Sequence, residues 1–575
     1  MRRGAALLAA ASLFVGACSS GGEAPPEESP TPTEVRSPTP SPSPSEPAGP
    51  IEGGTLRYAL GADPQTIDPR FVTDAEGRVV VDALFDSLVR LDDDFEVQPA
   101  AAESWEVSED ATRFEFTLRE GATFHNGRPV RAADFARAFN RMANGTAEPR
   151  SFVAYQLAPV EGFEAAQLDG EPLSGLEVVD DRTLVITLSA PFAEFLEVLA
   201  DPSLAPVPPR AESDPEAFGL APVGNGPFQM SGEWSRGDFI RVARYPEYLG
   251  EEPFLDEVVF QIYANDPDQA SQYGAFEDGR LHVAEVPAER LEDAVDSLGA
   301  ARDGYSGPGV LNGPTTTLYY YGFNTERPPF DDPDVRRAIS LLIDRETIVA
   351  DVTDETRLVA DAIVPPSLPD HQDDACPYCA YDEERALRLW RGEGEPTEGA
   401  SPTEPSEPVD RGEGPLTIVH NEGRTHRAIA QRVATALRAT LEVEVQIEAR
   451  ELTEFVQTLR AGEMGIFRFG WQADYPSAGS YLHPLFSSDK DNLDNLSRYH
   501  NEEVDDLLRQ ALAETDAGAR TDLYRQVERH VLNQAVIAPI FVYRLHRVVA
   551  PEVHEFRHGP LGNVDLTRVW LDDAS

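Results

Sequence analysis

From about residue 53 onward, the chain alternates between short segments of two-residue period and longer segments of helical period. Residues 113–119 alternate apolar and polar side chains, and residues 184–188 form a short apolar run, so both segments predict strands. Residues 79–89 place Val80, Leu84 and Leu88 on one face of a predicted helix. The body of the chain is therefore expected to mix strands and helices.

One stretch in the second half has the pattern of a β–α–β unit. Residues 416–420 and 443–447 are strand-like, and residues 425–437 between them have a helical period. Such units favour a parallel sheet, whose ligand sites lie at the carboxyl ends of the strands. The next predicted strand, residues 464–471, would deliver Asp474 to that edge.

The segment 469–476 gathers two aromatic rings, a glycine and one carboxylate before a Tyr475-Pro476 break. This pattern predicts a buried strand that ends at a surface, with Asp474 at its mouth. A partly desolvated carboxylate there can hold a cationic group of a ligand. Asp474 can equally be a turn-capping residue beside core aromatics, and from chemistry alone both interpretations stay open.

Length and charge narrow the class of protein. A chain of 575 residues exceeds one simple core and suggests two or three domains. The formal net charge of −53 makes nucleic acid an unexpected partner, because phosphate binding needs a basic face. The acidity favours solubility and indicates nothing about a substrate.

The first 50 residues predict export and a tether. A positive start is followed by an apolar segment too short to span a bilayer, so residues 1–17 have the pattern of a signal peptide. The segment ends in Val15-Gly16-Ala17-Cys18, which resembles a bacterial lipobox and implies lipidation of Cys18. An ordinary export signal with an incidental cysteine is the alternative. Residues 18–50, rich in Pro, Ser, Thr and Glu, predict a disordered tether.

The other two cysteines form Cys376-Pro377-Tyr378-Cys379. In an exported protein such a pair is most simply a small disulfide. A redox site and a zinc site are the alternatives. A redox site needs a thiol of lowered pKa, which the acidic residues that follow would oppose. A zinc site with His371 would still need a fourth ligand, and none is evident.

Several motifs, in order, resemble the family 5 extracytoplasmic solute-binding proteins of ABC transporters. They are Trp105-x-Val107-Ser108, Gly121-x-x-Phe124-His125-x-Gly127-x-Pro129-Val130, Ala132-x-Asp134-Phe135, Gly224-x-Gly226-Pro227-Phe228, the block from Phe323-Asn324 to Asp344-Arg345, Gly470-Trp471-x-Ala473-Asp474-Tyr475, and residues 535–543. The glycine-rich loop at 224–226 lacks the phosphate-binding spacing. His125 is expected to be structural, because no nucleophile and carboxylate accompany it.

The resemblance implies an α/β, periplasmic-binding-protein-like two-lobe fold of the large type II, with mixed sheets flanked by helices and a ligand cleft between the lobes. We expect lobe I to comprise residues 51–312 and 541–575, with an extra subdomain at about 99–204. Lobe II would comprise residues 313–540, with a disordered insertion at about 391–414.

The resemblance also implies a set of ligand-binding residues. Asp474 would receive the free ammonium group of a peptide, and Trp471 would wall a side-chain pocket. The backbone at Gly470 and Gln472 would bond peptide groups. The remaining expected positions are Tyr475 in the site, Arg468 for a ligand carboxylate (or in a surface ion pair), and Phe323, Asn324, Pro539 and Ile540 at the hinge.

The function implied is that of a monomeric, non-catalytic receptor that passes short peptides to an ABC permease. It would sit outside the cytoplasmic membrane, anchored through Cys18, and would need no cofactor or metal. The same fold could instead bind a nickel or other metal chelate, haem or an oligosaccharide. An exported hydrolase is the alternative of another class, although no nucleophile elbow or zinc-helix motif is visible.

Overall fold

The computed structural model describes residues 49–394, 414–489 and 492–572. The predicted signal peptide, nearly all of the tether and most of the predicted insertion lie outside these residues. The description below therefore concerns the body of the chain, from residue 50 onward.

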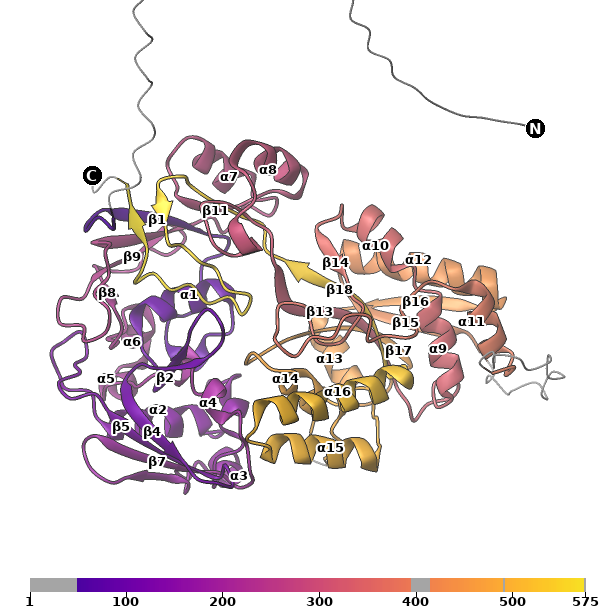
Figure 1. Cartoon of the computed structure of the whole chain (residues 1–575), viewed down its shortest axis with the longest axis horizontal. Coiled ribbons are helices and arrows are strands. Elements are labelled where there is room, and N and C mark those ends of the chain that lie inside the picture. The colour runs from indigo at the N-terminus through magenta and orange to yellow at the C-terminus, as the bar shows by residue number, and fades with distance from the viewer. Residues whose placement is uncertain (1–48, 395–413, 490–491, 573–575) are drawn as a thin grey trace, which may run out of the picture. The chain divides into compact units, whose positions relative to one another are not determined.

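Two large mixed sheets organise this body (Figure 1). The first has seven strands in the order β12 (Gly309–Leu311), β19 (Arg547–Val549), β11 (Val283–Glu285), β1 (Thr55–Leu60), β10 (Glu257–Ile262), β9 (Phe239–Arg244) and β8 (Phe228–Met230). The second has six strands in the order β14 (Arg357–Val359), β18 (Ile537–Arg544), β13 (Pro314–Phe323), β17 (Ile466–Gln472), β15 (Leu416–Asn421) and β16 (Val445–Arg450).

Smaller sheets complete the strand content. A four-stranded antiparallel sheet has the order β4 (Ala102–Val107), β5 (Arg113–Leu118), β7 (Thr183–Thr187) and β6 (Leu176–Val178), and it lies within the range expected for the extra subdomain. Two pairs are formed by β2 (Val89–Leu91) with β3 (Val97–Pro99) and by β20 (Val553–His554) with β21 (Trp570–Leu571).

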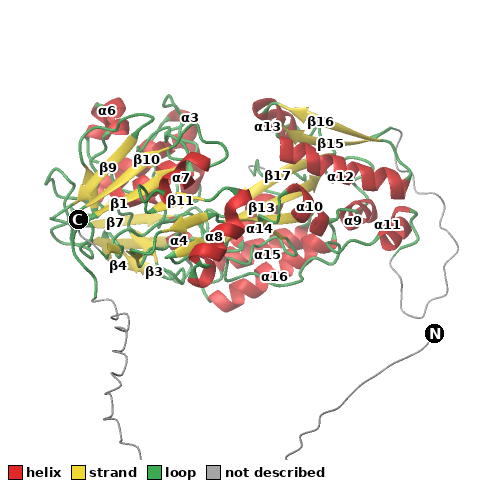
Figure 2. Ribbon diagram, turned by 90° about the horizontal axis from the view of Figure 1, so that it is seen from above, coloured by secondary structure: helices red, strands yellow, loops and turns green. Residues whose placement is uncertain are grey.

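The α-helices flank these sheets (Figure 2). In the first half of the chain they are α1 (Ala75–Leu84), α2 (Ala132–Ala143), α3 (Phe163–Asp169), α4 (Phe195–Val198), α5 (Arg210–Ser213), α6 (Pro215–Leu220), α7 (Ala270–Glu277) and α8 (Leu291–Leu298). In the second half they are α9 (Pro333–Leu341), α10 (Arg345–Val352), α11 (Glu383–Trp390), α12 (Arg424–Leu441), α13 (Leu452–Arg460), α14 (Gly479–Phe486), α15 (Glu502–Ala513) and α16 (Ala517–Asn533).

Strand β13 shows why the second sheet needs helices on both faces. Its side chains alternate between two apolar clusters: Leu318 and Tyr320 belong to one, and Tyr319 and Tyr321 to the other. All four are almost completely buried. A central strand that is apolar on both faces is typical of a sheet covered by helices on both sides. The predicted β–α–β unit is confirmed, since β15 and β16 pair in parallel on either side of α12 in the chain.

The chain passes between the two sheets at two adjacent points. It leaves β12 for β13 at Asn312 and Gly313, and it returns from β18 to β19 at Leu545 and His546. The crossings are tied together, because the Leu545 amide donates to the Gly313 carbonyl at 2.8 Å.

The crossings differ from the predicted hinge and from the predicted lobe boundary at residue 541. Phe323 and Ile540 are buried in strands of the second large sheet, buried Asn324 directly follows β13, and Pro539 lies opposite Tyr320 in that sheet. Strand β18 runs on to Arg544 before the chain leaves this sheet. Residues 537–542 are all buried and apolar, so the sequence pattern does not show at which residue this strand ends.

The glycine-rich loop at 224–226 is used for close packing. A Cβ atom on Gly224 would lie 1.9 Å from the Leu84 carbonyl oxygen, and one on Gly226 would lie 2.5 Å from the Phe85 amide nitrogen. The Gly226 amide donates to the Leu84 carbonyl at 2.9 Å. Helix α1 therefore ends at Leu84, five residues before the end predicted from its period.

His125 holds this loop from its other side. The Gly224 amide donates to Nδ1 of His125 at 3.1 Å, so the ring's proton is on Nε2, which donates to the Gly226 carbonyl at 3.1 Å. Burial lowers the pKa of His125 to about 4, so the ring is neutral near pH 7. These contacts belong to a structural side chain.

We predict that Gly224→Ala lowers the free energy of unfolding by at least about 2 kcal/mol, because the new methyl group meets backbone that cannot move away. Gly274→Ala is the control. It lies in α7 with open space around the added carbon, so it should be neutral or slightly stabilising. Urea unfolding of both variants measures the difference. Equal midpoints for the two variants would contradict the packing role of Gly224.

Candidate ligand-binding site

Strand β17 is paired along its full length on one edge only. On that edge it meets β13, from Ile466 opposite Phe323 to Gln472 opposite Thr317. On the other edge β15 pairs with Ile466 and Phe467 and no further within the described residues. The segment 468–472 therefore presents backbone N–H and C=O groups that another extended chain could pair with.

Asp474 follows this open edge, inside a tight turn. Its backbone amide donates to Oγ of Ser480 at 2.7 Å, and Trp471 Nε1 donates to the Ser480 carbonyl at 2.7 Å. Ser480 thus fixes both the turn and the indole ring. The carboxylate itself is half-buried and accepts a hydrogen bond of 2.6 Å from the Tyr155 hydroxyl.

The surroundings of Asp474 make its charged form unfavourable. Burial raises the pKa of Asp474 to about 6, and the nearby Asp201 carboxylate adds to this, while the Tyr155 hydrogen bond and the Arg78 charge act in the opposite direction. A cation brought to this carboxylate would therefore find a charge that is poorly solvated and only partly compensated.

A cavity of about 640 Å³ opens beside Asp474. Its walls come from two distant parts of the chain, residues 152–198 and residues 460–512. They are mainly apolar and include five aromatic rings besides Tyr475: Phe152, Tyr155, Phe192, Phe469 and Trp471. A half-buried carboxylate at the rim of an aromatic cavity is an arrangement typical of a binding site for a small molecule.

A second cavity, of about 140 Å³, also reaches Asp474 and is lined by acidic side chains. Burial raises the pKa values of Asp82 and Glu197 to about 7 and that of Asp86 to about 6. Arg78 bridges to the buried Asp201 at 2.9 Å. Asp474 therefore lies between an aromatic cavity and an acidic one.

Comparison with known proteins identifies the family. The model of bacterial extracellular solute-binding proteins, family 5, matches residues 96–492, which is more than half of the chain. The chain belongs to this family. The predicted two-lobe α/β fold is confirmed for this family 5 protein, whose lobes are built on the two large sheets. The family consists of substrate-binding proteins.

Relatives of this family 5 protein are named for different ligands. It is 28% identical over 521 residues to the dipeptide-binding protein DppE of Bacillus subtilis, covering 89% of this chain and 90% of the relative. It is 30% identical over 531 residues to the probable deoxycholate-binding periplasmic protein YgiS of Escherichia coli, covering 90% and 93%. The structure of Haemophilus influenzae OppA in complex with the peptide RPPGFSPFR superimposes with a TM-score of 0.68 at 25% identity, covering 91% of this chain and 100% of that one.

The structure brings most of the predicted site residues together. Asp474, Trp471, Gly470, Gln472 and Tyr475 all line the aromatic cavity. The ring of Tyr475 is buried and lies 6.0 Å from the Phe192 ring, at an angle of 68°.

Arg468 is placed differently from the other predicted residues. Strand alternation puts it on the other face of β17, where its guanidinium lies 4.6 Å from the centre of the Tyr319 ring and donates to Oδ1 of Asn421 at 3.0 Å. It therefore faces away from the aromatic cavity, and its role in binding a ligand carboxylate stays a prediction.

Sequence patterns did not point to the residues that reach the site from the first half of the chain. Tyr155 lies in a short 3-10 helix, Ala154–Leu157, and Phe152 and Phe192 lie in loops; only the tertiary fold brings them to the cavity that Asp474 also lines. Phe152 and Tyr155 are unusual in their exposure, at 81% and 50%, whereas Phe192 is partly buried. That property is not visible in a sequence.

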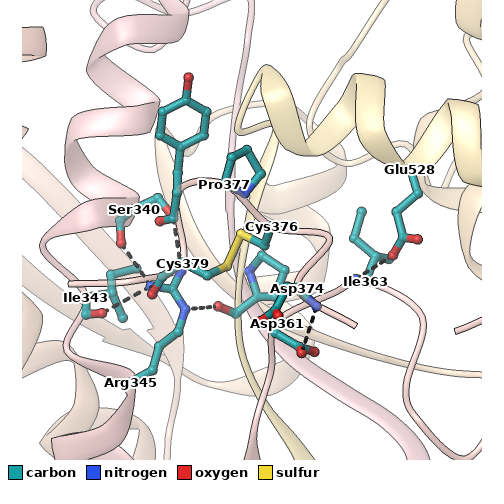
Figure 3. The surroundings of a disulfide bond; sticks show 12 residues. Ser340, Ile343, Arg345, Asp361, Ile363, Asp374, Cys376, Pro377, Cys379 and Glu528 are labelled. Atoms are coloured by element: carbon teal, nitrogen blue, oxygen red, sulfur yellow. Dashed lines mark hydrogen bonds between the residues drawn. A yellow bond between two sulfur atoms is a disulfide. The ribbon is translucent and has the colours of Figure 1, made fainter. Parts of the chain in front are cut away.

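Cys376 and Cys379 are joined in a disulfide, with Cα atoms 5.4 Å apart (Figure 3). The disulfide loop is tied down by Arg345, which donates to the Cys379 carbonyl at 2.7 Å, and by the Cys376 amide, which donates to the Asp361 carbonyl at 2.8 Å. Oxidised cysteines cannot supply thiolates, so the alternative of a zinc site built from them and His371 does not fit this arrangement.

His371 meets carboxylates instead. Its Nε2 lies 3.3 Å from Oδ1 of Asp373, and Asp361 completes a group whose potential ligand atoms lie within 4.8 Å of one another. Among the described residues, these three side chains are close enough to one another to approach one metal ion, although the Asp373 side chain is 94% exposed. Among the described helices, none has the length and apolar character needed to cross a membrane.

We predict that Asp474→Asn stabilises the free protein. The raised pKa means that the folded state favours the neutral carboxyl, so above pH 6 the ionised group costs stability that the amide does not. The amide oxygen can still accept from Tyr155. We expect a gain of about 1–2 kcal/mol in the free energy of unfolding at pH 8, less than the full shift implies because part of the side chain reaches water.

The gain should shrink as the pH falls through 6, because the wild-type carboxyl is then protonated. Urea unfolding at pH 8 and pH 4.5 measures it, with the exposed Asp268→Asn as the control for removal of one surface charge. A destabilised Asp474→Asn protein at pH 8 would contradict the account of this carboxylate.

Proposed function

We propose that this family 5 protein is the substrate-binding lipoprotein of an ABC importer and that it captures short peptides. The observation that carries the proposal is the position of Asp474. A half-buried carboxylate lies at the end of a strand whose outer edge is unpaired and at the rim of a cavity between two parts of the chain. A peptide offers a positive amino terminus and an extended backbone, which match these two features.

In the proposed complex, the ligand's ammonium group pairs with Asp474. The ligand backbone continues along the open edge of β17, where Gly470 and Gln472 offer peptide groups, and Trp471 forms a wall for a side chain. The lobes would close on the ligand by rotation about the crossings at residues 312–313 and 545–546. Arg468 would contact the ligand only if the ligand, or a movement of the lobes, brought a carboxylate to the face of β17 where Tyr319 and Asn421 lie.

Names of the relatives support a peptide over other ligands of this family. The Bacillus subtilis relative is a dipeptide-binding protein, and the superimposed Haemophilus influenzae structure contains a nonapeptide. Another relative is named as a probable deoxycholate-binding protein; deoxycholate is an anion, and an anion would be disfavoured by Asp474 and by the acidic cavity beside it. Metal chelates and oligosaccharides lack the combination of a single cation and a strand-like backbone.

Export and anchoring form a separate part of the proposal. The signal peptide and Cys18 would place the protein outside the cytoplasmic membrane, held there by a lipid, and the tether would let the body reach its permease. The receptor would act without catalysis, so a bound peptide should be recovered intact. Recovery of cleaved peptide would favour an exported hydrolase.

We predict that a free tripeptide such as Phe-Ala-Ala raises the Tm of the protein and binds with a measurable enthalpy in titration calorimetry. Its N-acetylated form should bind at least about 100-fold more weakly, because the amide leaves the Asp474 carboxylate without a cation. Asp474→Asn should lose most of the affinity for the free peptide, and Asp268→Asn should keep it. Equal binding of free and acetylated peptides would rule out the proposed anchor.

Peptide affinity should also depend on pH. Above the pKa of about 6 the Asp474 carboxylate is ionised, and below about pH 8 the peptide amino group is protonated, so affinity should be highest between these values. Below pH 6 it should fall about tenfold per pH unit, because protons compete with the ammonium group. Asp82→Asn, which removes another carboxyl of raised pKa, should keep this profile. Constant affinity between pH 4.5 and 7 would contradict the role of Asp474.

A further inference from the structure

The cavity beside Asp474 is apolar enough to select among peptides. Phe152 is the most exposed large hydrophobic residue of the described part of the chain, at 81%, Tyr155 is 50% exposed, and both line this cavity. Phe469 and Trp471 form the facing wall, from the other lobe. Large apolar side chains left in contact with water on a concave surface are typical of a place that a ligand covers.

The distance from Asp474 identifies which part of a peptide would cover them. In an amino acid, the side chain begins at Cβ, only about 2.5 Å from the amino nitrogen. Asp474 lies on the rim of the aromatic cavity, so a peptide held there by its ammonium group places its first side chain within reach of this cavity. The second side chain of an extended peptide points to the opposite side.

We infer that the preferred ligands are short peptides whose first residue carries a large apolar side chain, and that Phe152 is a residue that determines this preference. The inference rests on the proposed function and specifies its ligand. Burying a benzyl or isobutyl group against these rings should favour such a peptide by about tenfold to a hundredfold over one that begins with alanine.

The acidic cavity offers the competing outcome. It also reaches Asp474, and its Asp82, Asp86 and Glu197 could receive a basic first side chain. It is the smaller of the two, at about 140 Å³ against about 640 Å³, and Arg78 lies inside it in an ion pair with Asp201. A lysine entering it would meet that arginine, whereas an apolar group entering the aromatic cavity meets carbon atoms.

The test measures, by titration calorimetry, how tightly the protein binds each of four tripeptides: Phe-Ala-Ala, Leu-Ala-Ala, Ala-Ala-Ala and Lys-Ala-Ala. We expect the first two to bind about tenfold to a hundredfold more tightly than Ala-Ala-Ala. Tightest binding of Lys-Ala-Ala would overturn the inference in favour of the acidic cavity. Equal affinities would overturn it while leaving the proposed function in place. Failure of all four to bind would overturn both.

A variant pair then tests Phe152 itself. Phe152→Ala should reduce the affinity ratio of Phe-Ala-Ala to Ala-Ala-Ala about threefold to tenfold, with little effect on Ala-Ala-Ala alone. The side chain is mostly exposed, so its removal should not disturb folding. Leu168→Ala is the matched control, because Leu168 is 69% exposed on α3 and does not line the cavity. An unchanged ratio in Phe152→Ala would show that this ring does not determine the preference.

Discussion

The site depends on one strand that is held firmly on one edge and left open on the other. Strand β13 fixes β17 by continuous pairing, and β13 is itself held by buried tyrosines on both of its faces. The pairing of β15 stops at Phe467. Residues 468–472 are therefore held by β13 on one edge, while their hydrogen-bonding groups on the other edge have no strand partner within the described residues. A binding edge on such a strand needs little ordering when a ligand arrives, which favours affinity.

A buried carboxylate brings the other wall of the site to this strand. Glu194 accepts a hydrogen bond from the Tyr524 hydroxyl at 2.7 Å and pairs with Arg520 Nε at 3.2 Å, so it joins the α4 region to α16. It is 2% exposed, and burial raises its pKa. Loss of one partner would leave an uncompensated buried charge, so this contact strongly favours the arrangement in which Tyr155 meets Asp474.

The sequence predicted those elements whose structure follows from the local spacing of apolar residues, and it did not predict features that depend on tertiary packing. The unit β15–α12–β16 follows from its alternating and helical patterns, and the turn at Asp474 follows from its Tyr-Pro break. The predicted boundary between residues 312 and 313 falls at the first crossing, but the second crossing lies after Arg544 and not at residue 541, because a strand that is buried on both faces is apolar along most of its length and its pattern does not mark its end. Phe152 likewise reaches the cavity only through the tertiary fold, which its local sequence does not indicate.

The environment of Asp474 favours binding of a cationic group, and the aromatic cavity beside it would then favour some ligand shapes over others. The ionised form of the Asp474 carboxylate is unfavourable in the free protein, because burial and the Asp201 charge raise its pKa and the hydrogen bond from Tyr155 compensates only in part. An ammonium group beside it would stabilise the ionised carboxylate, whereas a neutral or anionic group would not. In the proposed complex, every peptide with a free amino terminus would gain this same contribution, so selectivity among such peptides would have to come from the two cavities that reach Asp474.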